Sequence, residues 1–455
     1  MRRRLRLLWV TPNLPRRGVA AARERVWALL ARLAPRHDVS VLALVDPEDQ
    51  GAPDSVLPPG LAAVHRVPKE PFAPDDPLAL LPRTVRWGYA HPRYRAALAE
   101  RLASGRYDLV QLEYDELAYL APQPSVPTIL TVYQLGFGTA LREWRARGGG
   151  AVDGALGLYR WLRVLDFELR AMSCAHHVVT MSAEDAARLR RFHPELRVTV
   201  SPVGVDCAYF RPETPAPAPE VDLAFVGHFE HPPNPDAATF LVRDVLPRLG
   251  CPARVRIIGQ GVTPAVAALA RPDVVEIAGA VPDVRPHLAH AAVVAAPVRF
   301  GTGMRGKVVE ALAMGRPVVT TSVGAEGLGA TSGQHLLIAD GAADFAAAVR
   351  GLLDDPARAA RLGAAGRAFV EARFDWDPIA DAHDALYADV VRDPGTPPAL
   401  PADHAPALAR LVRGRPAVVA GAALLAARAV GWHLRRAPVQ GATPLATPVA
   451  ERARA

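Results

Sequence analysis

The sequence has 455 residues, half of them apolar and 22% of them charged, and these proportions exclude a disordered or fibrous chain. Because this length exceeds one ordinary hydrophobic core, we expect two domains with smaller additions. The net charge of +7 lies almost entirely after residue 394, where eight arginines stand against two acidic residues, so the nearly neutral remainder argues against a nucleic-acid-binding face.

Cysteine usage and the N-terminus both favour a cytoplasmic protein. Cys174, Cys207 and Cys251 have neither the pairing of a disulfide framework nor the spacing of a zinc site. The basic N-terminus continues into a short apolar run that Arg6 interrupts, and no small-residue cleavage motif follows. We therefore interpret this run as the first strand of the fold rather than as a signal peptide.

The first half of the chain alternates strands with helices. Residues 5–12 predict a strand, residues 19–34 carry apolar side chains at helical spacing, and residues 37–45 predict a second strand. A strand, a helix and a strand within about 40 residues form the βαβ unit of a parallel sheet. Further strands are predicted at 107–114, 127–133, 175–182 and 197–202, which gives a first Rossmann-like domain over residues 1–210.

A second alternation follows a proline-rich linker at residues 211–222. Strands are predicted at 223–227, 254–259, 274–279, 293–298, 317–321 and 335–340, with helices between them and a last helix that ends near residue 353. This pattern gives a second Rossmann-like domain over residues 223–374. The sequence therefore predicts an α/β protein with two doubly wound domains facing a cleft, and ligands bound at the carboxyl ends of the strands.

The C-terminal region is predicted to contain a crossover helix and a basic tail. Residues 375–392 are amphipathic and suit a helix that returns to the first domain. In the tail, residues 393–455, the apolar run from 416 to 427 is too short to span about 30 Å of hydrocarbon. Arginines flank it, so residues 407–436 predict a helix lying on an anionic membrane surface. The alternative is an unstructured tail.

The stretch RFGTGMRGKVVEALAMGRPVV, residues 299–319, holds one of only two lysines in the chain. It reads as a glycine-rich turn that opens a helix, where backbone N–H groups and the helix dipole attract an anion such as a diphosphate. Lys307 stands in the first turn, where a bound phosphate would offset its unfavourable position, and Glu310 lies three residues further on. The alternative is a solvated Lys–Glu pair on the helix surface.

An ordered set of segments resembles the retaining glycosyltransferases of family 4, which have the GT-B architecture. The resemblance covers about residues 5–391, and its segments are 198–212, 223–241, 256–261, 277–298, 307–328 and 374–387. It implies transfer of a sugar from a nucleotide-diphosphate sugar to a lipid-linked or saccharide acceptor, with retention of configuration, in cell-surface polysaccharide synthesis. It also implies that no metal and no cofactor are required.

The resemblance implies a role for each candidate site residue. Glu310 would bind the ribose of the donor as the second glutamate of the E-x7-E motif, Arg305 and Lys307 would stabilise its diphosphate, and these three form the catalytic set. The other donor-binding residues are Gly227, Val281 near the base, Gly301, Thr302, Gly303, Met304 and Glu326. The acceptor-binding residues of the first domain are Asn13, Gly18, Arg23, Glu113 and Tyr133.

Three departures from the family pattern affect the donor and acceptor contacts. Thr302 stands where the first glutamate of the motif is common, and Tyr133 with Gln134 replaces a common histidine. His228 follows Gly227, so the arginine and lysine that usually clamp the diphosphate after this strand are absent. We interpret Arg305 and Lys307 as their replacement.

Weaker signals are better explained by structure than by ligand binding. Residues 259–264 resemble a dinucleotide loop but lack its third glycine. Asp375 suits a helix N-cap, and Asp206 suits a backbone tether in the turn before the linker. His176 and His177 lack metal-ligand spacing. Two rival functions remain open, a nucleotide-sugar epimerase of the same architecture and a non-catalytic protein that binds saccharide or membrane.

Overall fold

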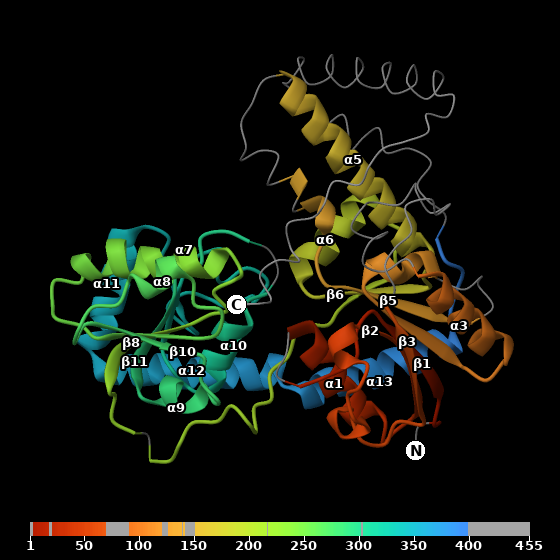
Figure 1. Ribbon diagram of the computed structural model, residues 1–455, viewed down its shortest axis with the longest axis horizontal. Coiled ribbons are helices and arrows are strands. Elements are labelled where there is room, and N and C mark those ends of the chain that lie inside the picture. Colours follow the sequence, from red (N-terminus) through yellow and green to blue (C-terminus); the bar gives the residue numbers. More distant parts are fainter. Residues whose placement is uncertain are drawn as a thin grey trace. The chain divides into compact units, whose positions relative to one another are not determined.

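The computed structural model describes residues 3–17, 21–69, 91–120, 126–138, 140–141, 151–215, 217–301 and 304–398. Contacts divide the chain into two compact units, one of Met1–Thr139 with Val164–Ala402 and one of Ala140–Arg163 with Asp403–Ala455. Figure 1 shows two layered α/β lobes in the first unit, each built around one sheet. The described residues of the second unit belong mainly to helix α5, Ala151–Ser173.

The first lobe contains a seven-stranded parallel sheet in the order β3-β2-β1-β4-β5-β6-β7. Its strands β1 and β4 are almost entirely buried, as near-continuous apolar runs in a sheet covered on both faces should be. The strands are β1 Arg6–Thr11, β2 Asp38–Val45, β3 Ala63–Pro68, β4 Leu109–Glu113, β5 Thr128–Val132, β6 His177–Thr180 and β7 Val198–Val200.

The second lobe contains a six-stranded parallel sheet in the order β10-β9-β8-β11-β12-β13. In each lobe the first strand therefore lies inside the sheet, and successive strands are added on one side of it and then on the other. The strands are β8 Val221–Val226, β9 Val255–Ile258, β10 Val275–Gly279, β11 Ala291–Ala296, β12 Val318–Thr320 and β13 Leu337–Ile338.

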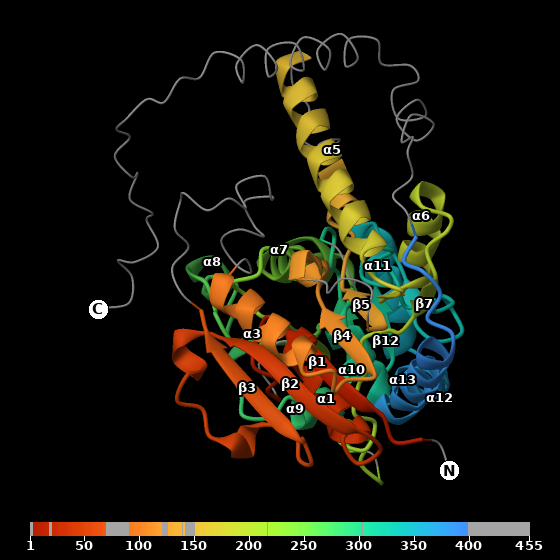
Figure 2. The same ribbon diagram turned by 90° about the vertical axis from the view of Figure 1, so that its right-hand side faces the viewer.

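Helices cover the faces of both sheets. One core of the second lobe joins its sheet to α7 and α11, and another joins it to α9, α10 and α12, in agreement with Figure 1. In the first lobe α3 lies along β1 to β3 (Figure 2). The bounds of these and further helices are α1 Ala21–Leu33, α3 Pro92–Ala103, α6 Ala183–Phe192, α7 Pro233–Phe240, α8 Pro264–Ala267, α9 Arg285–Ala289, α10 Gly306–Ala313, α11 Ala342–Leu353, α12 Pro356–Phe374 and α13 Trp376–Arg392.

Helix α13 is the crossover helix that the sequence predicts. Its apolar side packs against α1 and the first sheet, with Trp376 and Tyr387 buried in the core of the first lobe. The preceding helix α12 instead packs in the second lobe, where a Cβ on Gly363 would lie 2.2 Å from the Gly315 carbonyl oxygen. The chain therefore leaves the second lobe at Asp375 and continues in the first.

The structure contains elements that the sequence patterns do not predict. Strand β3 and helices α3, α5, α6 and α12 are all additional. The helix predicted between the first two strands of the second domain ends as α7 at Phe240 and is followed by a π turn and a 3-10 turn. The predicted tail from 399 onward lies outside the described residues. Within the described ranges, none of the helices combines the length and apolar character needed to cross a membrane.

Candidate functional site

The second sheet changes its direction of growth between β8 and β11, which are neighbours in the sheet although two strands separate them in sequence. The loops that leave such a pair of strands diverge to opposite sides of the sheet. They leave a crevice at the carboxyl ends of the strands, which is where doubly wound folds bind ligands. Strand β8 ends at Val226 and β11 ends at Ala296. The segments that follow these strands carry the glycines and cations expected to bind a donor.

The segment after β8 brings Gly227 and Asn234 together. The Gly227 N–H donates to the Ile258 carbonyl oxygen at 2.9 Å, which extends the β8–β9 pairing by one residue. A Cβ on Gly227 would lie 3.1 Å from the Asn234 Cβ and 3.4 Å from the Lys307 Nζ, so a larger side chain would crowd this corner. The Asn234 Nδ2 donates to the His228 carbonyl oxygen at 2.7 Å and thereby closes the loop.

Lys307 reaches this corner from α10. Its Nζ donates to the Asn234 Oδ1 at 2.5 Å and lies 4.8 Å from the centre of the Phe225 ring, above the end of β8. Burial and the positive charge of Arg305 lower the pKa of the Lys307 ammonium to about 7, and the negative charge of Glu310 opposes the shift. A cation is therefore held in a partly dry position at the switch point.

Arg305 and Gly301 form the second wall of the same corner. Arg305 occupies the N-cap position of α10 and is only 9% exposed. Gly301 has a φ of 108°, a conformation that favours glycine, and a Cβ there would lie 3.2 Å from the Arg305 Nη2. The guanidinium thus lies against the backbone at Gly301, and the first N–H groups of α10 follow directly.

Glu310 does not form the surface pair that was the alternative interpretation. Among the described residues, no hydrogen bond or ion pair joins it to Lys307, whose ammonium donates to Asn234 instead. Burial raises the pKa of the partly buried Glu310, against the opposing charge of Lys307. The solvated Lys–Glu pair is therefore excluded, because both groups lose hydration and the lysine binds a neutral amide.

The other predicted donor residues lie at several places around the sheet. Met304 precedes Arg305 and packs against the core formed by α9, α10 and α12. Val281 follows β10 and packs against a small apolar cluster that includes Ile258. Glu326 is partly buried on the turn that follows β12. Thr302 and Gly303 lie outside the described residues.

In the first lobe, Asn13 and Arg23 belong to a dense network of charges at the ends of β1 and β2. The Arg23 Nη2 donates to the Asp46 Oδ2 at 2.7 Å and to the Asn13 Oδ1 at 3.4 Å. The Nζ of the second lysine, Lys69, donates to the Asn13 Oδ1 at 3.1 Å and to the Asp46 Oδ1 at 2.8 Å. Gly18 lies outside the described residues.

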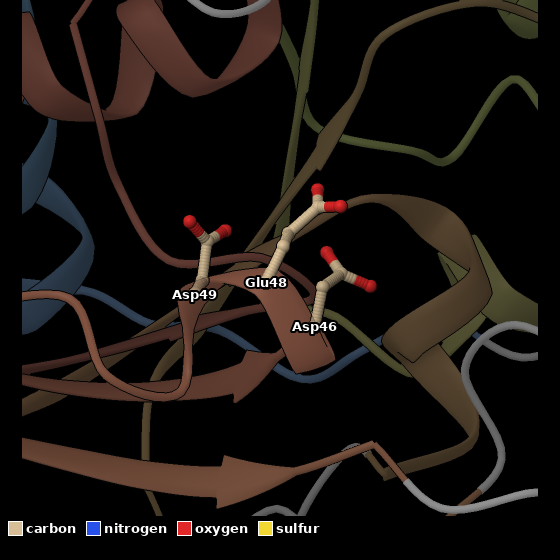
Figure 3. A group of neighbouring side chains, drawn as sticks. All are labelled: Asp46, Glu48 and Asp49. Atoms are coloured by element: carbon tan, nitrogen blue, oxygen red, sulfur yellow. The ribbon is translucent and has the colours of Figure 1, made fainter. Parts of the chain in front are cut away.

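The acidic group in this network does not provide an open metal site. Asp46, Glu48 and Asp49 lie close together after β2 (Figure 3). However, Asp49 accepts hydrogen bonds from Arg16 at 2.5 Å and from Arg23 at 2.6 Å, and Asp46 is paired with Arg23 and Lys69. Two of the three carboxylates are thus already neutralised by cations, which leaves little charge to attract a metal ion.

The structure corrects the prediction that Glu113 faces an acceptor. Its side chain is 0% exposed and accepts hydrogen bonds from Gln111 at 3.1 Å, Thr131 at 3.2 Å and Tyr133 at 2.8 Å. Glu113 also lies 3.6 Å from the buried Arg25. Tyr133 keeps part of its surface exposed but turns its hydroxyl toward Glu113. The Glu113 carboxylate is therefore already supplied with hydrogen-bond donors inside the lobe.

Other assignments made from the sequence agree with the contacts. Asp206 accepts from the N–H groups of Ala208 at 3.1 Å and Tyr209 at 2.9 Å, as expected of a turn tether. Asp375 occupies the N-cap position of α13, although its side chain makes no capping hydrogen bond. His176 accepts from the Thr128 N–H at 3.1 Å, which gives it a structural role.

Sequence patterns missed the residue that holds Lys307. Asn234 lies 73 positions before Lys307, and its segment follows β8 in place of the usual clamp. A signal was present, because asparagine occurs only twice in the chain, each time after a proline and shortly after the first strand of a lobe. In the structure each of the two lysines donates to one of these asparagines.

Comparison with known sequences identifies both lobes. Residues 18–204 match the model of the glycosyl transferase 4-like domain, and residues 220–355 match that of glycosyl transferases group 1. D-inositol 3-phosphate glycosyltransferase of Rhodococcus opacus (strain B4) is 27% identical over 47% of this chain. Glycogen synthase of Mycobacterium tuberculosis is 39% identical over 21% of this chain. The chain spans 53% and 24% of the lengths of these two relatives.

Comparison with solved structures agrees with this result. Sucrose-phosphate synthase from Thermosynechococcus elongatus has a TM-score of 0.65 at 20% identity, over 85% of this chain and 99% of that protein. Anabaena HepE in complex with UDP has a TM-score of 0.60 at 14% identity, over 85% of this chain and 100% of that protein. The chain has the GT-B fold and belongs to the glycosyltransferase family that the two matching domain models describe.

Proposed function

We propose that this protein is a glycosyltransferase that uses a nucleotide-diphosphate sugar as donor and transfers the sugar, with retention of configuration, to a lipid-linked or saccharide acceptor. The single observation that carries the proposal is the corner at the end of β8. There Lys307, Arg305 and the start of α10 gather positive charge at the switch point of the sheet. A diphosphate is the ligand whose charge and size suit this position.

The chemistry of the proposed reaction requires stabilisation of a departing nucleoside diphosphate. Negative charge develops on the diphosphate as its bond to the sugar breaks, and fixed cations and N–H groups in a partly dry site stabilise it. Lys307 and Arg305 would supply the cations, and the positive end of the α10 dipole would add to them. In the proposed reaction, Lys307, Arg305 and the start of α10 therefore take the part that a metal ion would otherwise play in stabilising the diphosphate.

The remaining donor contacts follow from the same placement. Glu310, one turn into α10 from Lys307, would accept hydrogen bonds from the ribose hydroxyls of the donor. Val281, in the segment after β10, would contact the base, and Gly227 would leave room for the diphosphate. HepE, with the same fold, has been crystallised with UDP and with UDP-glucose, which makes a uridine nucleotide the first donor to test.

Thermal unfolding with a panel of nucleoside diphosphates tests the donor assignment. We expect one member of UDP, GDP and ADP to raise the midpoint of unfolding by a few degrees at a concentration about 100 times its Kd, since a ligand that binds only the native state stabilises it by about 2.7 kcal/mol. The matching nucleoside without phosphates is the control and should have little effect. Equal shifts by the nucleoside and its diphosphate would contradict a diphosphate site.

We further propose that the basic tail brings the enzyme to an anionic membrane surface, where a lipid-linked acceptor would be found in cell-surface polysaccharide synthesis. Support comes from sequence alone, because eight arginines stand against two acidic residues after position 394 and flank an apolar run. The protein would then be cytoplasmic and bound peripherally to the membrane.

Deletion of residues 395–455 tests the membrane proposal. The truncated protein should keep the nucleotide-induced thermal shift but lose binding to vesicles that contain anionic lipid, because about 1 kcal/mol per basic residue is lost near such a surface. Neutral vesicles serve as the control for the full-length protein. Vesicle binding that survives the deletion would refute the role of the tail.

A further inference from the structure

The contact between Asn234 and Lys307 has a consequence for how the proposed donor site carries its charge. A buried lysine usually pairs with a carboxylate, which neutralises it. Here the partner of the ammonium is the amide oxygen Oδ1 of Asn234, at 2.5 Å, and among the described residues no carboxylate forms an ion pair with it. The position of the cation is therefore fixed without a direct ion pair.

The surroundings of Lys307 reinforce this arrangement. On its own helix the charged neighbours are Arg305 before it and Glu310 after it. On the segment after β8, His231 lies near enough for the charges of Arg305 and Lys307 to help burial lower its pKa. The Phe225 ring lies beneath the ammonium, at 4.8 Å. Glu310 is the negative group among these neighbours of Lys307, and within the described part of the chain it forms no ion pair with the ammonium.

Asn234 is itself held in place. It is only 7% exposed, and its Nδ2 donates to the His228 carbonyl oxygen at 2.7 Å, so the side-chain oxygen must point away from that bond. This bond turns the amide oxygen toward Lys307. The orientation agrees with the chemistry of the lysine, because an ammonium can only donate hydrogen bonds. The loop after β8 thus aims a neutral acceptor at the ammonium.

We propose that Asn234 is a positioning residue that holds the Lys307 ammonium at the end of β8 through a neutral oxygen, so that its whole charge is available to the diphosphate of the donor. This inference rests on the proposed function. It adds that donor binding takes up a proton, because an ammonium that is partly deprotonated in the free protein becomes fully protonated beside a diphosphate.

The sign of the pH effect follows from the pKa of Lys307, which is about 7 in the free protein. Above this pH the free protein loses the proton that the complex retains, so affinity falls as the pH rises. Nucleoside diphosphates are already fully ionised above about pH 7, so their own titration does not produce this fall. We expect at least about a tenfold loss of affinity between about pH 7 and pH 9 in the wild-type protein.

Isothermal titration of the full chain with UDP, GDP and ADP tests the proposal in the variant Asn234→Asp. The new carboxylate would pair with Lys307 and compete with the diphosphate, so the Kd at about pH 7 should rise at least about tenfold. The same carboxylate would keep the lysine protonated to higher pH, so the change in affinity up to about pH 9 should shrink to less than about threefold. A purely structural role would not flatten the pH profile.

Two controls separate the charge from other effects of the substitution. Asn234→Asp also loses the bond to His228, so the substitution is repeated in a Lys307→Met background, where it should change affinity by less than about threefold. Gln334→Glu makes the same chemical change at an exposed position of the same lobe and should leave binding unaltered.

The possible outcomes distinguish this inference from the proposed function. Nucleotide binding by the wild-type protein, with weaker and less pH-dependent binding by Asn234→Asp, would support both. Wild-type binding with an unchanged Kd and pH profile in the folded Asn234→Asp variant would overturn the inference alone. Equal losses with and without Lys307 would also overturn it. A wild-type protein that binds none of the three nucleotides would overturn the proposed function and this inference with it.

Discussion

Replacement of Lys307 by methionine is expected to weaken binding of the preferred nucleoside diphosphate at least about tenfold, or about 1.4 kcal/mol. Methionine keeps much of the length of the lysine side chain but removes the cation that lies above the end of β8. Hydrogen bonds from charged groups contribute about 1.5–3 kcal/mol, which makes the predicted loss a lower limit. Titration calorimetry with UDP, GDP and ADP measures it directly.

The same substitution should not destabilise the folded protein. The pKa of Lys307 falls from 10.5 to about 7 on folding, so the unfolded chain binds a proton that the native state binds less well. Wild-type stability therefore decreases as the pH is lowered from about 10.5 to about 7, and the methionine variant should lack this contribution. An unfolding midpoint at pH 7 that equals or exceeds that of the wild type would show that lost binding is not lost folding.

Lys69→Met provides a matched control, because it removes the only other lysine of the chain. Lys69 also donates to an asparagine, but it is paired with Asp46 in the first lobe. Its replacement should leave nucleotide binding within about twofold of the wild-type value, since the ion pair it leaves lies outside the donor corner. Near-normal binding and turnover by Lys307→Met would count against the assignment of the donor site.

Replacement of Glu310 by glutamine is expected to weaken binding of the same nucleotide by about tenfold, because the amide keeps one acceptor but places a donor where a ribose hydroxyl would donate. The substitution also removes a buried negative charge at little cost in shape. The lost affinity should come from contacts with the ribose rather than with the diphosphate. A ligand without the ribose hydroxyls tests this.

The ligand-side control is the dideoxy analogue of the same nucleoside diphosphate. The wild-type protein should bind it more weakly than the ribonucleotide, and Glu310→Gln should bind both ligands with similar affinity, because the interaction that distinguishes them is gone. If Glu310→Gln discriminated between the two ligands as strongly as the wild type, the ribose assignment of Glu310 would be wrong.

Much of the fold could be predicted because its strands are buried on both faces. Apolar runs such as those of β1, β4, β8 and β11 give an unambiguous pattern, and their order along the chain indicated two doubly wound lobes. Strand β3, AVHRVP, is only partly buried at the edge of its sheet and carries two polar residues, so its pattern is weak. Helix α12 has a weak apolar stripe because small residues such as Gly363 and Gly366 make its contacts.

The candidate site could be predicted in part, because its chemistry is concentrated in one stretch of sequence. Gly301, Arg305, Lys307 and Glu310 lie within ten positions of one another, and a glycine-rich turn before a helix has a known affinity for anions. The rarity of asparagine marks Asn234 but does not reveal its partner, because its pairing with Lys307 depends on two loops that meet only when β8 and β11 are adjacent.

The prediction for Glu113 was wrong for a related reason. A carboxylate at the end of a parallel strand suits a ligand site, and the sequence gives no sign that it has partners. Those partners come from a helix and a neighbouring strand, since Arg25 lies on α1 and Thr131 lies on β5. Only the folded arrangement brings them together around the buried group.

The most direct test of the donor site is a crystal structure of the full chain with the nucleoside diphosphate that it binds. We predict that diphosphate oxygens lie within about 3 Å of the Lys307 Nζ and of the N–H groups that open α10. A nucleotide bound elsewhere, with the Lys307 ammonium still bonded to Asn234 and in contact with no phosphate oxygen, would contradict the account.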